Sequence, residues 1–258
     1  MSFTASVLLN TGGGTFGAAT SHPTSGQPKS VAVGDLNGDG KADIVVANQT
    51  GNNVSVLIGN GLGAFANAVN YSTGGFPSSV VIGDLDSDGH ADVAVANYND
   101  GNVSVLLGRG NGVLSGAVNF ATGSNPYSIA LADFNGDGVP DLTVANYGSG
   151  NASVLRGTGA GLFAARVNFA AGSNPFSVAT SDVNGDGKVD LVVANYTSNN
   201  VSVLLGDGAG SFASAVNFAA GTTPESVVLV DLNGDGRPDL ALADYTTNTV
   251  SVLLNTCK

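Results

Sequence analysis

The feature that most constrains the fold is an acidic segment that returns at a fixed interval. Five such segments begin 49 residues apart, at Asp35, Asp84, Asp133, Asp182 and Asp231. A fixed period of this length indicates a repeat architecture. A single repeat of this size cannot bury its own apolar faces, and stacking on its neighbours buries them. The fold is therefore set by what one repeat forms.

Each repeat predicts four short β-strands. The first repeat reads SVAVGD before the acidic segment, then DIVVAN, VSVLIG and AVNYSTG after it, and the other repeats read alike. These segments are bounded by Gly, Asn, Asp or Pro, and none is long or periodic enough to be a helix. Four strands in a repeat of roughly 40–50 residues are typical of a propeller blade. We expect an all-β fold, a β-propeller of five four-stranded blades.

The phase of the repeat suggests how the propeller closes. The repeats are 28–76, 77–125, 126–174 and 175–223, and the last combines 224–258 with 1–27. We expect one domain over 1–258, with a strand near Phe16–His22 completing the last blade. Pairing of the N- and C-terminal strands would remove exposed edges. The hexapeptide SVLLNT occurs twice, at Ser6–Thr11 and Ser251–Thr256, and one copy is redundant in a closed five-blade ring. An array cut from a larger propeller, or two chains paired through their edges, is the alternative.

A Gly-rich turn in each repeat ends in one large apolar residue. The residues are Phe16, Phe65, Leu114, Phe163 and Phe212. Because they recur at one point of the repeat, we expect them to pack between blades.

Composition excludes several classes of protein. The chain has one Met and one Glu, so a helical bundle is excluded. Its net charge is −12, and 16 of its 20 acidic residues lie in the five segments, which argues against a nucleic-acid partner. No apolar run approaches the roughly 20 residues of a membrane span. Cys257 is the only cysteine, which excludes a disulfide framework.

The acidic segments carry the spacing of a metal-binding loop. Side-chain oxygens at positions 1, 3, 5 and 9 and the backbone carbonyl at position 7 can converge on one hard cation, and Gly at position 6 permits the turn. Oxygen ligands in a flexible loop favour Ca²⁺ over Mg²⁺, so we expect about five Ca²⁺ ions, one per repeat. The expected ligands are Asp35, Asn37, Asp39, Lys41 and Asp43; Asp84, Asp86, Asp88, His90 and Asp92; Asp133, Asn135, Asp137, Val139 and Asp141; Asp182, Asn184, Asp186, Lys188 and Asp190; and Asp231, Asn233, Asp235, Arg237 and Asp239.

An EF-hand is the alternative for these loops, and it fails at position 12. An EF-hand needs a bidentate acid there, whereas these loops have Val46, Val95, Val144, Val193 and Leu242. A metal-free acidic turn is also disfavoured, because sixteen clustered carboxylates repel one another without a counter-ion.

The five D-x-[ND]-x-D-G-x-x-D loops, the VVAN-type and VSVLLG strands and the G-x-G-x-F turn together resemble the FG-GAP/VCBS repeat family. Nearly the whole chain shares this resemblance. It implies an integrin-α-type propeller with Ca²⁺ in the loop between strands 1 and 2 of each blade. Val-Ala-Asn stands here where integrin-type repeats have Gly-Ala-Pro, and the family's propellers commonly have seven blades.

We expect the calcium to be structural, because all five sites use protein ligands and repeat in register. Metal binding is then linked to folding. Loop two has Asp86 where the others have Asn, so it should bind Ca²⁺ at least as tightly as they do.

Residues that differ between repeats are the candidates for binding a ligand. The turns between strands 2 and 3 carry Tyr98, Tyr147, Tyr196 and Tyr245, and Tyr127 and Phe176 follow the proline before strand 1. Both positions lie on the blade face opposite the calcium loops. Aromatic rings there could stack on a sugar or hold a peptide; the alternative is that they pack on the next blade.

These observations favour a non-enzymatic recognition or adhesion module for a glycan or protein. His22 and His90 are the only imidazoles, and no catalytic motif is present. A structural or self-assembling unit is the alternative, and a polysaccharide-active enzyme is a weaker one. The start, MSFTASVLLN, has no basic n-region and too short an apolar stretch for a signal peptide, so we expect none in this segment. We nevertheless expect an extracellular or cell-surface location, since weak multi-site loops fill at millimolar Ca²⁺. A monomer is expected.

Overall fold

The computed structural model describes residues 3–256. Its contacts group into two compact units, residues 1–119 and 120–258, which are described separately below. Over residues 3–256 the chain forms strands and turns only, with no helix long and apolar enough to cross a membrane. Cys257 lies outside the described residues. The all-β prediction is confirmed.

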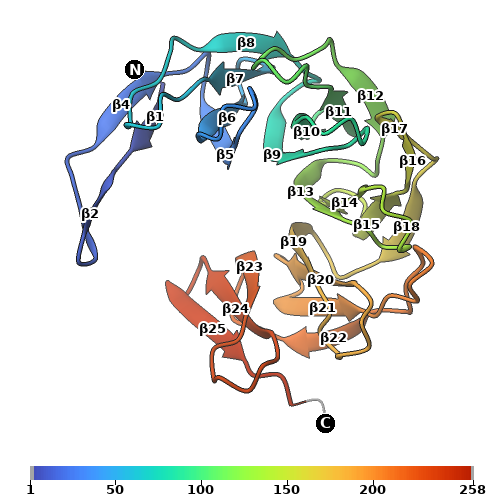
Figure 1. The fold of residues 1–258 in the computed structure, drawn as a ribbon. Coiled ribbons are helices and arrows are strands. Elements are labelled where there is room, and N and C mark those ends of the chain that lie inside the picture. The colour runs from blue at the N-terminus through green and yellow to red at the C-terminus, as the bar shows by residue number, and fades with distance from the viewer. Residues whose placement is uncertain (1–2, 257–258) are drawn as a thin grey trace. The chain divides into compact units, whose positions relative to one another are not determined.

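Unit one contains a strand pair, a short hairpin and two four-stranded antiparallel sheets (Figure 1). The pair is β1 (Thr4–Val7) with β4 (Thr20–Pro23), and the hairpin between them is β2 (Asn10–Gly12) with β3 (Thr15–Phe16). The first sheet is β5 (Pro28–Gly34), β6 (Asp43–Asn48), β7 (Asn53–Leu57) and β8 (Val69–Ser72). The second is β9 (Pro77–Gly83), β10 (Asp92–Asn97), β11 (Asn102–Leu106) and β12 (Val118–Ala121), whose last residues pass the unit boundary.

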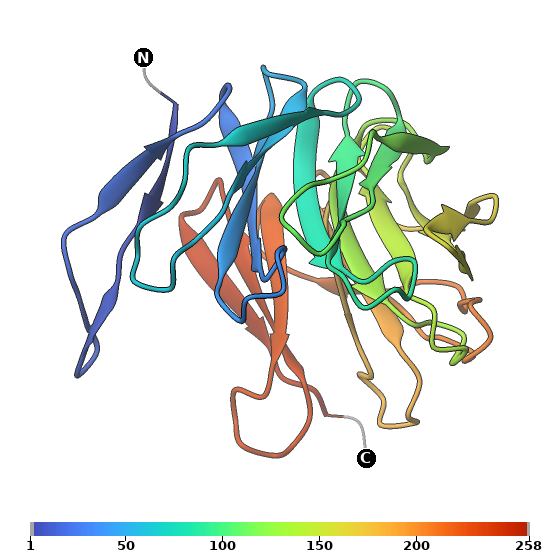
Figure 2. The same cartoon turned by 45° about the horizontal axis from the view of Figure 1, so that its top comes forward.

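Unit two contains two four-stranded sheets and one three-stranded sheet, the last drawn in red in Figure 2. The first sheet is β13 (Pro126–Ala132), β14 (Asp141–Asn146), β15 (Asn151–Leu155) and β18 (Val167–Ala170), with a hairpin of β16 (Gly157–Gly159) and β17 (Leu162–Phe163). The second is β19 (Pro175–Ser181), β20 (Asp190–Asn195), β21 (Asn200–Leu204) and β22 (Val216–Ala219). The third is β23 (Pro224–Val230), β24 (Asp239–Asp244) and β25 (Thr249–Leu253).

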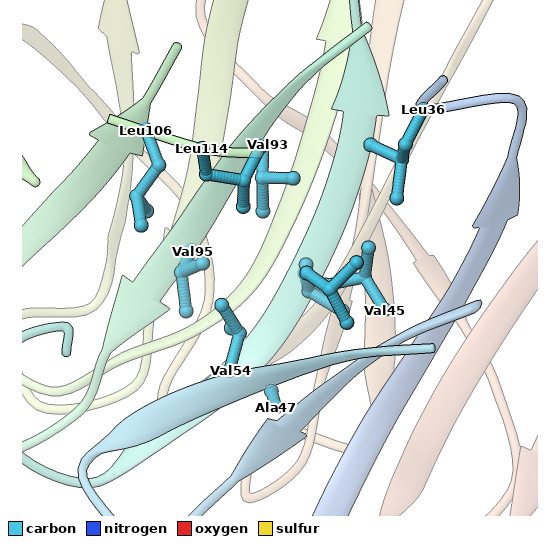
Figure 3. Close-up of a cluster of buried hydrophobic side chains, with 10 residues drawn as sticks. Leu36, Val45, Ala47, Val54, Val93, Val95, Leu106 and Leu114 are labelled. Atoms are coloured by element: carbon cyan, nitrogen blue, oxygen red, sulfur yellow. The ribbon is translucent and has the colours of Figure 1, made fainter. Parts of the chain in front are cut away.

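The second strand of each four-stranded sheet is buried along its whole length. All six residues of β6, β10, β14 and β20 are buried. Apart from Thr143 in β14, the residues between the first Asp and the last Asn are all apolar rather than alternating, because both faces of the strand are covered. In unit one, Val45 and Ala47 of β6 lie in one apolar cluster with Val93 and Val95 of β10 (Figure 3). Neighbouring sheets therefore share a core, as expected of stacked blades.

The apolar residue of the Gly-rich turn packs against the preceding sheet. Phe212 is buried with its ring centroid 5.4 Å from that of Phe134 and 5.2 Å from that of Phe169. Phe163 lies in the same way 5.2 Å from Phe120, and Leu114 is buried in the core of unit one. The predicted packing role holds for these residues. Phe16 differs, since it is 61% exposed.

The two terminal segments form incomplete sheets. β4, which overlaps the strand predicted near Phe16–His22, pairs with β1. The sheet β23–β24–β25 has three strands. The closure of the propeller by pairing of the chain ends stays a prediction.

Candidate functional site

Each acidic loop joins the first two strands of a sheet and is held by its own first aspartate. In the third loop, Asp133 Oδ1 accepts a hydrogen bond from the Gly136 N–H at 2.8 Å, and its Oδ2 accepts one from the Gly138 N–H at 2.8 Å. Gly138, at position 6, has a φ of 81°, which a side chain would disfavour. Burial would raise the pKa of Asp133, but the hydrogen bonds from these amides together outweigh it and lower the pKa.

The aspartate at position 9 ties the loop to the Gly-rich turn. Asp141 is fully buried, and its Oδ2 accepts the Phe134 N–H at 3.0 Å while its Oδ1 accepts the Gly157 N–H at 2.7 Å. The same pair of bonds recurs at Asp43, Asp92, Asp190 and Asp239. Sequence reasoning assigned this residue only a metal-ligand role; the structure adds a second one within the fold.

Burial raises the pKa of three of these carboxyls. The pKa of Asp92 rises to about 6, because burial outweighs the hydrogen bonds from Gly108 and Leu85. The pKa values of Asp141 and Asp190 are raised for the same first reason. Nearby loop carboxylates add to each shift, so a cation among them would favour the ionised form.

The second loop gathers the most negative charge. Carboxylate oxygens of Asp84, Asp86 and Asp88 all lie within 4.8 Å of one another. Burial, with the charges of Asp88 and Asp84, raises the pKa of Asp86. Such a group of hard oxygens around one point fits a divalent cation.

In three other loops a basic side chain at position 7 lies beside the acid at position 5. Lys41 Nζ is 3.1 Å from Asp39 Oδ2, and the equivalent distances are 3.7 Å for Lys188 to Asp186 and 4.0 Å for Arg237 to Asp235. Exposed pairs of this kind contribute little to stability, about 0–1 kcal/mol. His90 and Val139 occupy position 7 in the second and third loops.

Four of the six predicted ligand-binding aromatics form one cluster in unit two. The ring centroids of Tyr127 and Phe176 are 3.9 Å apart, and Phe176 stacks on Tyr196 at 5.5 Å. Tyr147 lies 6.2 Å from Tyr127 and 6.4 Å from Tyr196. The four rings come from two neighbouring sheets and are half-buried. The expected packing on the next blade therefore occurs, and it leaves part of each ring exposed.

The other two predicted aromatics lie elsewhere. Tyr98 is in unit one, and its ring centroid lies 5.8 Å from that of Phe76. Phe76 was not among the residues predicted from the sequence. Phe76 has a φ of 61°, an uncommon conformation for a bulky residue. Tyr245 is 64% exposed and lies outside the cluster.

The aromatic cluster and the acidic loops lie at opposite ends of the same sheet. Strand β13 pairs with β14 from Pro126↔Asn146 at the aromatic end to Ala132↔Asp141 at the loop end. A strand of this length spans roughly 20 Å, so the two regions are separate.

The asparagine that ends the second strand of each four-stranded sheet is structural. Asn146 is fully buried, and its Nδ2 donates to Asn151 Oδ1 and to Ser153 Oγ, both at 2.8 Å. Ser153 Oγ in turn donates to Asn168 Oδ1 at 2.8 Å. The asparagine recurs at the same position of the four repeats, and this recurrence could have indicated its structural role. The sequence analysis did not make that inference.

The repeats described above also match a known protein family. A family model described as FG-GAP-like repeat matches five times, over residues 4–46, 35–95, 84–144, 133–193 and 182–242. The chain belongs to the FG-GAP-like repeat family. The first matched region contains one acidic loop, and each of the other four contains two acidic loops with the strands between them. No curated protein matches the chain.

Solved structures similar to this FG-GAP-like chain are propeller-type proteins of low sequence identity. One from Bacteroides uniformis, provisionally assigned as a 6-phosphogluconolactonase, has a TM-score of 0.74 at 18% identity over 96% of this chain and 73% of its own. An Agrocybe aegerita lectin that recognises non-reducing terminal N-acetylglucosamine has 0.61 at 21% over 98% and 75%. BBS1N in complex with ARL6DN has 0.64 at 15% over 95% and 71%. These likenesses show the propeller-type fold.

Proposed function

We propose that this FG-GAP-like chain is a calcium-stabilised, non-enzymatic recognition module that binds a glycan or protein ligand. The aromatic cluster of Tyr127, Tyr147, Phe176 and Tyr196 carries the proposal. Half-buried rings held by their neighbours present apolar faces and polar hydroxyl groups together, which suits stacking on a sugar or on a peptide side chain. Little conformational entropy is lost when rings that are already ordered bind a ligand.

Calcium would be held by the five acidic loops at the other end of the sheets. In loop two the ligands would be Asp84, Asp86 and Asp88 with the carbonyl of His90, and Asp92 would complete the set. The oxygen donors fit Ca²⁺ in kind. When bound, the ion would supply positive charge that offsets the loop carboxylates. Filling such loops at millimolar Ca²⁺ supports an extracellular or cell-surface setting.

Removing the extra charge of loop two should weaken its calcium site. We expect Asp86→Asn to lower the Ca²⁺ affinity of that site about tenfold, because ligand charge tunes affinity in such loops. Isothermal titration of the full chain measures it. The matched control is Asn135→Asp, which adds the same charge to loop three and should raise affinity there. Equal affinities in all three proteins would contradict the assignment of position 3 as a ligand.

A glycan array tests the ligand. The folded chain is screened in saturating Ca²⁺ and again in EDTA, with terminal N-acetylglucosamine among the probes because a lectin of similar fold recognises it. Binding to a defined sugar class should fall about tenfold or more in Phe176→Ala, which removes the ring at the centre of the cluster. Tyr245→Ala removes an exposed ring outside the cluster and should leave binding unchanged.

A blank array from folded protein would count against a glycan ligand and favour the protein ligand. Binding that survives in Phe176→Ala would place the site away from the cluster. Turnover of a bound polysaccharide would contradict the non-enzymatic reading.

A further inference from the structure

The residues that follow the first proline of each sheet in unit two form a row across neighbouring strands. They are Tyr127 on β13, Phe176 on β19 and Glu225 on β23. Each lies at the register shift near the start of its strand. The row therefore consists of two aromatic rings followed by one carboxyl group, which belongs to the only glutamate of the chain.

The backbone places Glu225 beside Phe176 in the way that it places Phe176 beside Tyr127. In both cases a backbone N–H of the later strand donates to a serine Oγ of the earlier strand, at 3.2 Å and 3.3 Å. The donors and acceptors are Val178 with Ser128 and Val227 with Ser177. The ring centroids of Tyr127 and Phe176 are 3.9 Å apart. Because the same strand contact is repeated, the Glu225 side chain projects next to the Phe176 ring.

A second ring borders the Glu225 side chain by the same equivalence. Tyr147, in a turn of the sheet before that of Phe176, lies 6.3 Å from Phe176 between ring centroids. Tyr196 stands 49 residues after Tyr147 and is in the sheet before that of Glu225. The rings of Phe176 and Tyr196 therefore both lie at the side chain of Glu225.

Glu225 stands where a ring would complete the aromatic cluster. Tyr196 stacks on Phe176, which belongs to the same sheet, at 5.5 Å. Tyr245 is the equivalent of Tyr196 in the next sheet, and both tyrosines are held by the same backbone hydrogen bond. Tyr245 is nevertheless 64% exposed, because the equivalent of Phe176 in its sheet is a glutamate. A space that a ring would fill is therefore left open above a carboxyl group.

The carboxylate of Glu225 is half-buried and is not neutralised by a basic side chain. Within residues 3–256 the ion pairs involve three aspartates of the acidic loops, and none involves Glu225. Asp244 adds a second carboxyl group nearby, since it pairs in register with Pro224. The Oδ1 atom of Asp244 is buried and has no hydrogen-bond partner in the described structure.

The basic residues of unit two lie at the opposite end of its sheets. Over residues 120–256 they are Arg156, Arg166, Lys188 and Arg237. Arg156 and Arg166 adjoin the ends of β15 and β18 that are nearest the acidic loop, and the other two are within acidic loops. The aromatic end of this unit therefore carries carboxyl groups without a compensating positive side chain among the described residues. A positively charged ligand is attracted to such a surface.

Rings beside a carboxylate suit one class of cation in particular. The face of an aromatic ring attracts a cation, and aromatic cages recognise quaternary ammonium groups. A primary ammonium is strongly hydrated and has three N–H donors, for which this place offers a single carboxylate. A trimethylated ammonium has no N–H donor, and its methyl groups can contact the rings directly. The site therefore favours a methylated ammonium over a primary one.

We propose that Phe176, Tyr196 and Glu225 bind the trimethylammonium group of a trimethyllysine side chain in a protein ligand. This inference rests on the proposed function and specifies the ligand of that same site. The rings contact the methyl groups, and Glu225 pairs with the positive charge. A phosphocholine group would bring a phosphate close to Glu225 and Asp244, and like charges repel. A lysine side chain carries no such phosphate.

An NMR titration of the full chain in saturating Ca²⁺ tests the chemistry of the ligand. The probe is trimethyllysine capped as the N-acetyl methylamide. It is compared with a neutral isostere in which carbon replaces the ammonium nitrogen, with capped unmethylated lysine and with phosphocholine. The trimethyllysine probe should bind about tenfold more tightly than the isostere, because the two differ in charge and not in shape. It should also bind more tightly than lysine and phosphocholine.

Substitutions at Glu225 test its role. Glu225→Gln keeps the size of the side chain and removes its charge, so it should weaken binding of trimethyllysine about tenfold and leave binding of the isostere unchanged. Glu225→Phe should abolish binding of both probes, because a ring then fills the space. Asp207→Asn is the matched control. It removes the same charge from an exposed turn at the acidic-loop end and should alter neither affinity.

Equal affinity for trimethyllysine and its isostere, or unchanged affinity in Glu225→Gln, would overturn the inference. Tighter binding of phosphocholine than of trimethyllysine would overturn the assignment to a protein ligand. A neutral glycan or peptide whose binding falls in Phe176→Ala and not in Glu225→Gln would remove this inference and leave the proposed function standing. If no ligand depends on Phe176, both fall.

Discussion

Removing calcium with EDTA should lower the melting temperature of the chain by about 10 °C or more. A site filled at a hundred times its dissociation constant stabilises the fold by about 2.7 kcal/mol, and unit one contains two such loops. For a protein of this size each kcal/mol shifts the melting temperature by about 2–4 °C. Loss of Ca²⁺ should lower rather than raise the melting temperature because of charge repulsion. Five Ca²⁺ ions would bring the formal charge from −12 to −2. Differential scanning calorimetry with and without EDTA measures the shift.

The control distinguishes a specific site from charge screening. Returning Ca²⁺ after EDTA should restore the melting temperature, and the same concentration of Mg²⁺ should restore much less, since Mg²⁺ demands a tighter octahedron. Sodium chloride at equal ionic strength should also restore little. An identical melting curve in Ca²⁺ and in EDTA would remove calcium as a stabilising ligand.

The repeat made most of the fold predictable from sequence. Asp43–Asn48 and its equivalents are apolar between a first Asp and a last Asn, except for Thr143 in β14, and they form fully buried strands as expected. The aromatic residues in register were assigned to inter-blade packing, and Phe163 and Phe212 lie there. Periodicity succeeds in these places because one environment, repeated, selects one residue type.

The repeat did not predict the structure at the chain ends or the hydrogen bonds of the aspartate at position 9. Phe16 shares the sequence pattern of Phe212, yet no preceding sheet covers it in unit one, so a local pattern could not give its exposure. Asp141 shares the residue type of a metal ligand, and its hydrogen bonds reach Gly157, sixteen residues away. A contact at that separation depends on the register of β14 and β15, which spacing within the loop does not show.

Asp141 is both an expected metal ligand and a hydrogen-bond acceptor within the fold, so its substitution should have a large effect on stability. We expect Asp141→Ala to destabilise the chain by about 3 kcal/mol even in EDTA. The substitution leaves the buried N–H groups of Phe134 and Gly157 without an acceptor, and hydrogen bonds to a charged group contribute about 1.5–3 kcal/mol each. The cost of burying the Asp141 carboxylate offsets part of the stabilisation that these hydrogen bonds contribute. The same burial raises the pKa of Asp141. Urea unfolding in EDTA measures the change.

Asp137→Ala is the matched control in the same loop. Asp137 is exposed, and its Oδ1 accepts the Val139 N–H at 2.8 Å, so its loss in EDTA should stay within about 0.5 kcal/mol. In Ca²⁺ both variants should lose the stabilisation contributed by the third site, because both remove an expected ligand. Asp141→Ala should then be less stable to unfolding than the parent chain both in EDTA and in Ca²⁺. Asp137→Ala should be less stable than the parent chain only in Ca²⁺. Equal losses in EDTA would mean that position 9 has no role of its own in the fold, and a full calcium response in Asp137→Ala would exclude position 5 from the metal site.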